Sequence, residues 1–329
     1  MSHMSHTRQV FLNSDGAGIT LIAVAVYTLL RASDPSKPIR LFIVHDRSFA
    51  DMGGVARIQS VVDRFPFASV WFGDFTPVFS KYAEVFSNPG TKMVWAFPLC
   101  DKILPPDVTG NIVYIDIDML VRKDLGELFE MDLKRDGLVA AAVNESRRED
   151  RRYLVEAGWP EAAGYSFNNA CTVLDLDTFR AEGLSDKMIA WYAQHRAVAI
   201  NTDQDCQNVV YGARTRRLPP KWNYTDGWLE RLPRLNPFAR EWRVFPPRDM
   251  LEAILDPCII HYIGRRKPTA WTHRSERKVF RRAMEELGLV AVGGRLPGET
   301  APRIAIACAF DVYHAALRLY ARLLFACRR

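Results

Sequence analysis

Several features are scarce in this chain of 329 residues, and each scarcity excludes a class of protein. The six cysteines are scattered without paired spacing, mostly in apolar segments, which argues against a disulfide framework and against a zinc site. No apolar run reaches the roughly 18 residues that a membrane-spanning helix needs. The apolar stretch Ile19 to Leu30 is too short and follows a strand-like segment, so it predicts a first β–α unit rather than a signal peptide. The chain contains no internal repeat and no low-complexity stretch.

The remaining composition is that of an ordinary globular protein, with 48% hydrophobic and 25% charged residues. The length fits one large domain or two smaller ones. Residues 1–8 begin with Met-Ser-His-Met, which resembles the remnant of an expression tag, and they are expected to stand outside the fold. We therefore expect a catalytic or binding domain over residues 9–287, followed by a separate tail over residues 288–329.

The net charge of +6 is unevenly distributed along the chain. From Gly264 onward there are fourteen Lys and Arg residues against five Asp and Glu residues, whereas the preceding part is mildly acidic. This asymmetry favours an anionic partner for the C-terminal part, although a solvated basic face would give the same count. The basic residues gather near the tail without aromatic residues interleaved on strands, so nucleic acid is not the expected partner.

Strand-like runs alternate with helical patterns, such as Ile19 to Arg31 and Gly54 to Phe65. This alternation predicts parallel pairing in an open α/β sheet. Ligands of such sheets bind beyond the carboxyl ends of the strands. The predicted strands are Val10–Asn13, Ile39–Val44, Ser69–Phe72, Asn111–Asp116, Leu138–Val143, Cys171–Leu176 and Cys258–Tyr262.

The C-terminal segment predicts a Gly- and Pro-rich linker and then an amphipathic helix from about Arg303 to Cys327. Its apolar stripe could dock on the rest of the protein, which is the usual fate of such a stripe. It could instead lie in a membrane interface, where arginine beside tyrosine and phenylalanine is favourable. The basic surroundings favour the membrane. The predicted stripe is Ile306, Phe310, Tyr313, Leu317, Tyr320 and Leu324, with Asp311, His314, Arg318 and Arg322 on the opposite side.

The segment Val113–Val121 carries the strongest chemical signal, because an apolar β-branched run ends in Asp116 and Asp118. Paired carboxylates suit a hard divalent cation, and such a cation can hold a diphosphate. A D-x-D pattern alone is weak, since Asp175/Asp177 and Asp203/Asp205 repeat it. Its position at the end of a buried strand is what favours a site.

A second polar block follows a strand downstream, where His261, Gly264 and Lys267 lie within seven residues. His261 could ligate the metal as a neutral imidazole, and Lys267 could neutralise a diphosphate. A lone histidine at a strand end is more often structural, but the glycine and lysine that follow favour a site. Two further blocks, Asn201–Asn208 and Phe167–Ala170, would by themselves indicate only a helix N-terminus and a turn.

Together these blocks resemble glycosyltransferase family 8, whose retaining members include glycogenin and bacterial lipooligosaccharide galactosyltransferases. The similarity runs from about Val10 to Trp271. It rests on four motifs in the family's order: Y-I-D-I-D-M-L-V from Tyr114, F-N-N-A from Phe167, D-Q-D-x-x-N from Asp203, and H-Y-x-G-x-x-K-P from His261. The resemblance implies a GT-A fold, a Rossmann-like mixed sheet flanked by helices, here followed by a basic amphipathic helical tail.

The resemblance also implies a role for each motif residue. Asp116, Asp118 and His261 would ligate Mn²⁺ or Mg²⁺. Gly264 and Lys267 would hold the diphosphate of a UDP-sugar. The catalytic group would be Asp203 and Gln204 at the donor sugar, with Asn168 at the sugar or the leaving group. The remaining donor contacts would be Asn13 and Asp15 in the first loop, the backbone of Ile117 at the ribose, and Lys92.

Three departures from the family pattern affect the donor site. The first loop reads Asn13-Ser-Asp15-Gly16 where an acidic pair is frequent. Ala96 stands where many members carry an arginine, and Lys92, one turn earlier, is expected to compensate. Two residues are inserted before Trp271. These departures bear on which sugar is used more than on the class of enzyme.

The sequence leaves two other functions open. A haloacid-dehalogenase-type phosphatase also has a strand that ends in D-x-D, but on its first strand and with Thr or Val where this chain has Leu120. A non-catalytic module that binds sugar nucleotides or membranes would fit the basic tail, but has no need of a complete metal set. We therefore expect a retaining, UDP-sugar-dependent hexosyltransferase that acts on an oligosaccharide or glycolipid. The expected role is in lipopolysaccharide synthesis, at the inner face of the cytoplasmic membrane.

Overall fold

The computed structural model describes residues 7–86, 89–144, 154–155, 158–159, 166–225, 244–264, 267–270 and 276–326. Its internal contacts divide the chain into two compact units, each built from separate segments. Unit 1 comprises the chain up to Ile19, Asp34–Asp116 and Leu125–Leu218, and unit 2 comprises Thr20–Ser33, Ile117–Asp124 and Pro219–Arg329. The predicted domain boundaries after residues 8 and 287 do not coincide with the limits of these two units, and they stay a prediction.

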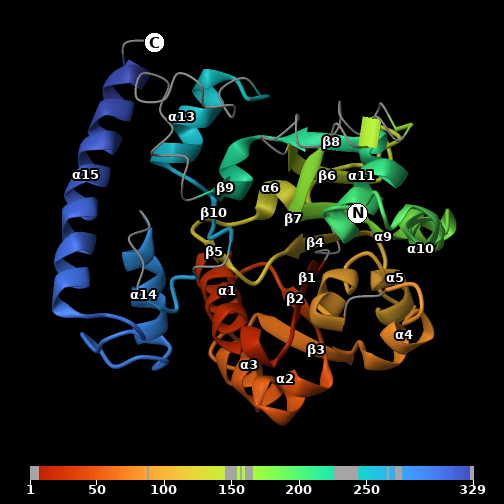
Figure 1. The fold of residues 1–329 in the computed structure, drawn as a ribbon, viewed down its shortest axis with the longest axis horizontal. Coiled ribbons are helices and arrows are strands. Elements are labelled where there is room, and N and C mark those ends of the chain that lie inside the picture. Colours follow the sequence, from red (N-terminus) through yellow and green to blue (C-terminus); the bar gives the residue numbers. More distant parts are fainter. Residues whose placement is uncertain are drawn as a thin grey trace. The chain divides into compact units, whose positions relative to one another are not determined.

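Unit 1 is built on a seven-stranded mixed sheet with the order β3-β2-β1-β4-β7-β6-β8 (Figure 1). Strands β1 to β4 pair in parallel, whereas β7 runs antiparallel to both β4 and β6. The strands are β1 (Arg8–Ser14), β2 (Ile39–His45), β3 (Ala68–Asp74), β4 (Asn111–Ile115), β6 (Ala140–Asn144), β7 (Phe167–Asp175) and β8 (Thr215–Leu218).

Aromatic and aliphatic side chains pack one face of this sheet against helices. Phe11 on β1 and Tyr114 on β4 meet Phe97, whose ring stacks on that of Tyr114 at a centroid distance of 4.1 Å. The helical segments of unit 1 are η1 (Gly16–Gly18), α2 (Arg47–Asp51), α3 (Gly54–Val62), α4 (Thr76–Lys81), η2 (Pro89–Trp95), α5 (Cys100–Ile103), α6 (Gly126–Phe129), α9 (Leu176–Ala181), α10 (Leu184–His195), α11 (Thr202–Tyr211) and η4 (Gly212–Arg214).

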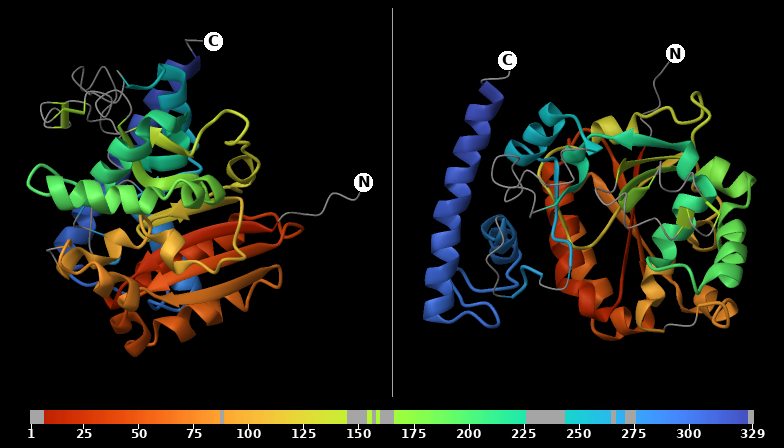
Figure 2. Two further views of the ribbon diagram at one scale, coloured as in Figure 1. Left: turned by 90° about the vertical axis from the view of Figure 1, so that its right-hand side faces the viewer. Right: turned by 45° about the horizontal axis from the view of Figure 1, so that its top comes forward.

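In its described residues, unit 2 contains a small sheet with the order β5-β10-β9 and five helical segments. β10 pairs antiparallel with β5 and parallel with β9. The right-hand view of Figure 2 shows the long α15 beside α13 and α14. The elements are α1 (Ile19–Ala32), β5 (Met119–Val121), η5 (Pro220–Asn223), β9 (Tyr224–Thr225), α13 (Pro247–Leu255), β10 (Ile259–His261), α14 (Arg277–Glu286) and α15 (Ala301–Ala326).

All seven predicted strands and both of the early helices are present, and the predicted α/β class is confirmed. Three short strands, β5, β8 and β9, were not predicted. The segment Phe167–Ala170 is not a turn, because β7 already begins at Phe167. The parallel pairing that the alternation predicted holds for β1 to β4, and the antiparallel β7 confirms the mixed sheet that the family resemblance implied.

The docked face of the C-terminal helix combines residues from both of the predicted faces. In α15 the face that packs on the rest of unit 2 carries Ala307, His314, Leu317 and Ala321, which are buried, together with Asp311 and Arg318. Three ion pairs with the start of α14 hold this face: Arg277 and Lys278 bind Asp311, and Arg318 binds Glu276. Charge complementarity between the two helices therefore decides which face is docked.

The outward face of α15 is apolar. Its exposed side chains include Val312, Leu319 and Leu323, with exposed fractions of 72%, 59% and 57%. The stretch Ala301–Leu323 is long and apolar enough to cross a membrane by length and composition, which the sequence analysis did not anticipate. It is a single helix of this kind among the described residues, and only 22% of its most apolar window is buried.

Candidate functional site

Polar residues collect where the strands of unit 1 end. β1 leads into Asp15, β2 into Asp46 and β4 into Asp116. Because β7 is antiparallel, its first residues, Asn168 and Asn169, lie just beyond the carboxyl end of β4, and the Asp116 amide donates to the carbonyl of Ala170 at 2.8 Å. This edge is where open α/β sheets bind ligands.

The first loop is fixed by hydrogen bonds that leave Asn13 partly unsatisfied. Asp15 caps η1 by accepting from the Gly18 amide at 3.1 Å. The Asn13 amide group donates to the carbonyl of Met93 at 2.8 Å, while its Oδ1 is buried and has no hydrogen-bond partner among the described residues. An unsatisfied buried oxygen at this edge is suited to a ligand donor.

Lys92 forms an ion pair with Asp46, at 2.5 Å between Nζ and Oδ2. Burial works against ionisation of Asp46, but the bonds from Lys92, Ser48 and the Phe49 amide hold the pKa of this carboxyl below its usual range. Ser48 also accepts from the Gly16 amide at 2.9 Å. Lys92 therefore belongs to the network that shapes the first loop. Its contact with Asp46 could not be predicted, because no motif links the two residues.

Asp203 and Gln204 lie at the start of α11 and contact the beginning of β7. Asn169 donates to Asp203 at 2.6 Å, and the Gln204 Oε1 accepts from the Asn168 side chain and the Asn169 amide, both at 3.4 Å. The pair of asparagines therefore holds both α11 side chains in defined orientations. Thr202, which precedes them, has φ of 28°, which makes it the one non-glycine residue with positive φ in the described part of the chain. A β-branched residue in this region is strained, and such strain concentrates at functional sites.

Asp203 has a strongly altered acidity. Burial, together with the negative charge of Asp116, raises its pKa to about 7, against the opposing hydrogen bond from Asn169. The shift shows that Asp116 and Asp203 act on one another electrostatically within unit 1. A cation bound at Asp116 would relieve that repulsion.

In unit 2 a second cluster forms around Asp118, which is 8% exposed. The ring Nε2 of His261 lies 3.3 Å from Asp118 Oδ1, and Lys267 forms an ion pair with Oδ2. Burial alone would raise the pKa of Asp118, but His261 and Lys267 hold it well below its usual range. Lys267 also donates to the carbonyl of Tyr262 at 3.0 Å, which fixes its position.

The hydrogen bond of the other ring nitrogen shows that this cluster suits a metal. His261 Nδ1 lies 2.8 Å from the Oδ1 of Asn223, and an amide oxygen only accepts, so Nδ1 carries the proton. When the ring is protonated, Nε2 donates to the Asp118 carboxylate, and when the ring is neutral, Nε2 presents its lone pair toward the same oxygen. A divalent cation that replaces the proton would have both atoms as ligands, and a hydrogen bond that fixes the tautomer is typical of metal-ligating histidines.

Asp116 joins this cluster through the chain itself. Only Ile117, in the turn between β4 and β5, separates it from Asp118. Asp116, Asp118 and His261 each offer one ligand atom, which is the ligand set that the motifs predict. One nitrogen and carboxylate oxygens form a donor set that suits Mn²⁺ or Mg²⁺.

Gly264 and Trp271 were singled out from the sequence, whereas Asn223 was not. Gly264 has φ of 93°, a conformation that favours glycine, so the chain after β10 makes a turn that other residues resist. Trp271 lies outside the described residues. Asn223 was not predicted, because nothing in the local sequence marks a polar residue at the end of η5 as a partner of His261.

The mixed sheet and the carboxylate pair at the end of β4 define a glycosyltransferase of the GT-A type, a class that comparison with solved structures supports. LgtC, a galactosyltransferase solved with donor and acceptor sugar analogs, superposes with a TM-score of 0.62 at 18% identity, over 90% of this chain and 99% of that one. The model of glycosyl transferase family 8 matches residues 101–273. The chain belongs to glycosyltransferase family 8.

Two curated relatives show how distant the similarity is. Probable UDP-glucose:glycoprotein glucosyltransferase A of Dictyostelium discoideum is 30% identical over 150 residues, which are 42% of this chain and 9% of that protein. Lipopolysaccharide 1,2-glucosyltransferase of Escherichia coli (strain K12) is 26% identical over 140 residues, or 43% of this chain and 39% of that one. The predicted family, fold and glycosyltransferase class are confirmed, and the phosphatase alternative is excluded.

Proposed function

We propose that this protein is a retaining, divalent-metal-dependent hexosyltransferase that uses a UDP-sugar as donor and an oligosaccharide or glycolipid as acceptor. The observation that carries the proposal is the facing pair of acceptors, Asp118 Oδ1 and His261 Nε2, with the histidine tautomer set by Asn223. Asp116 is the third proposed metal ligand. Lys267 beside Asp118 supplies a positive charge for a diphosphate.

Breaking a sugar–diphosphate bond builds negative charge on the leaving diphosphate, and several residues of the site are proposed to stabilise it. A bound divalent cation would supply Lewis-acid stabilisation of the leaving diphosphate. Lys267, held by the Tyr262 carbonyl, neutralises part of the same negative charge, and the turn at Gly264 lets the backbone approach the phosphates. Asn13, Asp15, Lys92 and the backbone of Ile117 are proposed to position the nucleoside.

Positive charge that develops on the sugar calls for oxygen atoms near the anomeric carbon. Asp203 and Gln204 are the proposed groups, with Asn168 orienting the Gln204 carboxamide. Because Gln204 offers a neutral amide rather than a carboxylate, we propose front-face attack of the acceptor with retention. A covalent glycosyl–carboxylate intermediate would need a different residue at that position.

The test is release of UDP from a panel of UDP-sugars, with and without Mn²⁺. The wild-type protein is compared with Asp118→Asn and with a control, Asp249→Asn, on α13. We expect Mn²⁺-dependent release from one donor, reduced at least 100-fold in Asp118→Asn and unchanged in Asp249→Asn. Equal activity of Asp118→Asn and wild type would refute the site. Mn²⁺-dependent UDP binding without turnover of any donor, even when candidate acceptors are added, would favour the non-catalytic sugar-nucleotide module.

The acceptor is proposed to lie at a membrane, because α15 turns an apolar face outward and is flanked by basic residues. Apolar side chains beside arginine favour the interface of anionic membranes. The curated relative from Escherichia coli acts, by its name, on lipopolysaccharide. We accordingly propose peripheral association with the inner face of the cytoplasmic membrane and a role in cell-surface glycan synthesis.

Sedimentation with anionic vesicles tests this attachment. The double variant Val312→Gln/Leu319→Gln keeps every ion pair between α15 and α14 but makes the exposed face polar. We expect it to lose most of its vesicle binding. Val292→Gln, at an equally exposed apolar residue of unit 2 outside α15, should bind as the wild type does. Undiminished binding of the double variant would contradict attachment through this face.

A further inference from the structure

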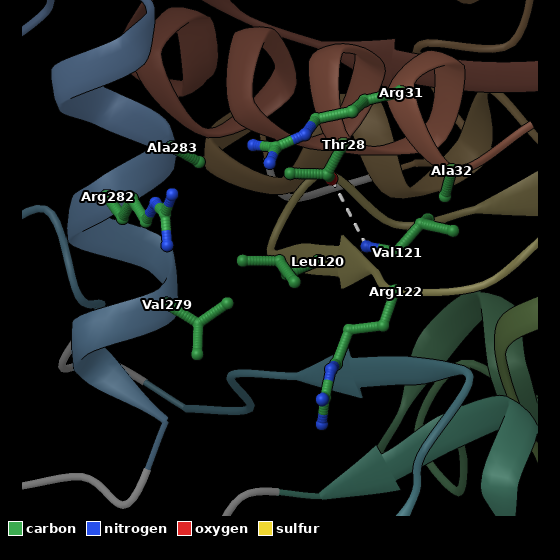
Figure 3. Close-up of a pocket in the computed structure, with 9 residues that line it drawn as sticks. All are labelled: Thr28, Arg31, Ala32, Leu120, Val121, Arg122, Val279, Arg282 and Ala283. Atoms are coloured by element: carbon green, nitrogen blue, oxygen red, sulfur yellow. Dashed lines mark hydrogen bonds between the residues drawn. The ribbon is translucent and has the colours of Figure 1, made fainter.

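A cavity of about 260 Å³ lies within unit 2, away from the residues of the proposed donor site. Its walls come from three elements that are distant in sequence: α1, the end of β5, and α14 (Figure 3). The lining residues are Thr28, Arg31, Ala32, Leu120, Val121, Arg122, Val279, Arg282 and Ala283.

Among the described residues of this lining, the charged ones are three arginines. Figure 3 shows Arg31 on α1 and Arg282 on α14 reaching into the space between the two helices, with Arg122 at the other end of the cavity. Arg31 and Arg282 both form ion pairs with one carboxylate, that of Glu286. One carboxylate cannot neutralise two guanidinium groups, and Arg122 adds a third positive charge, so the cavity attracts an anion.

The lining between the arginines is mainly apolar, and the hydroxyl of Thr28 within it already forms hydrogen bonds inside the protein. Leu120 and Val279 lie in the centre of the cavity. The Thr28 hydroxyl accepts from the Val121 amide at 3.2 Å and donates to the Val24 carbonyl at 2.8 Å. The lining residues that the structure describes include no carboxylate, histidine or cysteine, so they offer neither a metal ligand nor a nucleophile, and the cavity is suited to binding rather than to chemistry.

We infer that this cavity is a second anion-binding site, for a ligand that carries a phosphate monoester next to a non-polar or sugar-ring portion. Guanidinium groups pair with phosphate oxygens through two parallel hydrogen bonds, and Arg31 and Arg282 are exposed enough to turn toward a ligand. Leu120, Val279 and Ala283 then cover the part of the ligand that follows the phosphate. The inference does not depend on the identity of the donor sugar.

Calorimetric titration with inorganic phosphate, at an ionic strength matched with chloride, tests the site in the full chain. The variant Arg31→Gln/Arg282→Gln should weaken phosphate binding about tenfold or more, since charge-assisted hydrogen bonds are lost. Arg248→Gln on α13, an exposed arginine outside the cavity, should bind as the wild type does. If the double variant does not fold, Val279→Glu gives the same test, because it adds an opposing carboxylate and removes no ion pair.

The variant Lys267→Met separates this cavity from the proposed diphosphate site. Phosphate binding that survives in Lys267→Met and is lost in the arginine variant supports the inference. The reverse pattern, or no preference for phosphate over chloride, overturns it.

Two sources of the phosphate are then distinguished. A preference for phosphatidic acid over phosphatidylglycerol vesicles that depends on Arg31 and Arg282 indicates a lipid headgroup. Competition by glucose 6-phosphate without such a preference indicates a soluble ligand.

Discussion

At the scale of single residues, the hydrogen bond between Asn223 and His261 orients a proposed metal ligand. The side-chain oxygen Oδ1 of Asn223 selects the histidine tautomer that is protonated at Nδ1, and Nε2 of the same ring faces Asp118. Without this partner the ring can rotate or exchange tautomers, and the metal would lose a pre-oriented ligand. Asn223 is therefore expected to influence metal affinity without touching the metal.

Asn223→Ala should raise the Mn²⁺ concentration needed for half-maximal UDP release by about 10- to 100-fold, which is the usual effect of removing such a partner. Asn223→Asp keeps an acceptor oxygen and should restore most of the affinity. Titration of Mn²⁺ by electron paramagnetic resonance gives the same quantity without turnover. If both variants bound Mn²⁺ as the wild type does, His261 would be a structural histidine.

Asp203 predicts a pH dependence of stability in the metal-free protein. Its folded-state pKa of about 7 lies above the roughly 3.9 of an unfolded aspartate, so the folded state binds the proton more tightly. The stability that this group contributes is complete below about pH 4 and is lost as the pH rises through 7. Each pKa unit corresponds to about 1.4 kcal/mol, so a shift of about three units corresponds to a total loss on the order of 4 kcal/mol, of which about 2 to 3 kcal/mol falls between pH 5 and pH 8.

Urea unfolding in EDTA between pH 5 and pH 8 measures this loss. Asp203→Asn should flatten the dependence, whereas Asp107→Asn, at an exposed aspartate, should keep it. A wild-type stability that rose over this interval as steeply as it is expected to fall would contradict the assignment to Asp203.

At the scale of elements, ion pairs reinforce the buried apolar contacts that attach α15. Arg318 has an exposed fraction of 27% in its side chain and Glu276 of 6%, and burial lowers the pKa of the Arg318 guanidinium. The backbone carbonyl of Glu276 accepts from the hydroxyl of the fully buried Tyr262, which follows His261. The attachment of the tail thus reaches the strand that carries the proposed metal ligand.

Arg318→Met should lower the free energy of unfolding by about 2 kcal/mol, because it leaves the buried Glu276 carboxylate without its ion-pair partner. Arg322→Met, four residues further along and exposed, should change it by less than about 0.5 kcal/mol. Urea denaturation followed by far-ultraviolet circular dichroism provides the comparison. Equal effects of the two substitutions would mean that the ion pair contributes nothing specific.

The same helix shows which elements the sequence could predict. Long β-branched runs such as Ile39–Val44 were found because they carry their own signal, and so was the helical period of α15. The docked face of α15 was not, because it depends on Arg277, Lys278 and Glu276 of another helix. Strands of two to four residues, such as β9, form only because a partner strand is present, and local patterns do not reveal them.

The candidate site was predictable to a similar extent. Asp116, Asp118, His261 and Lys267 stand out because motifs place them at strand ends, where side chains leave the sheet. The partners that fix them, Asn223 for His261 and Asp46 for Lys92, come from segments 38 and 46 residues away, without a motif of their own. Their roles follow from distances that only the folded chain provides.

At the scale of the whole molecule, binding of the donor should stabilise the fold. A ligand that binds only the folded state at a concentration 100 times its Kd raises the free energy of unfolding by about 2.7 kcal/mol. UDP with Mn²⁺ should therefore raise the thermal midpoint of the wild type and leave that of Asp118→Asn nearly unchanged. A midpoint that rises with UDP equally well in EDTA would show that the metal takes no part in binding.

Unit 2 draws its first helix from the beginning of the chain and most of its remaining residues from the end. Tyr27 and Arg31 on α1 find their partner, Glu286, more than 250 residues later. At a synthesis rate of about 5–20 residues per second, more than about ten seconds therefore pass between the synthesis of the apolar α1 and that of its partners in α14. We therefore expect this non-contiguous architecture to make folding during translation depend on chaperones, and chains that stop before α14 to fail to fold.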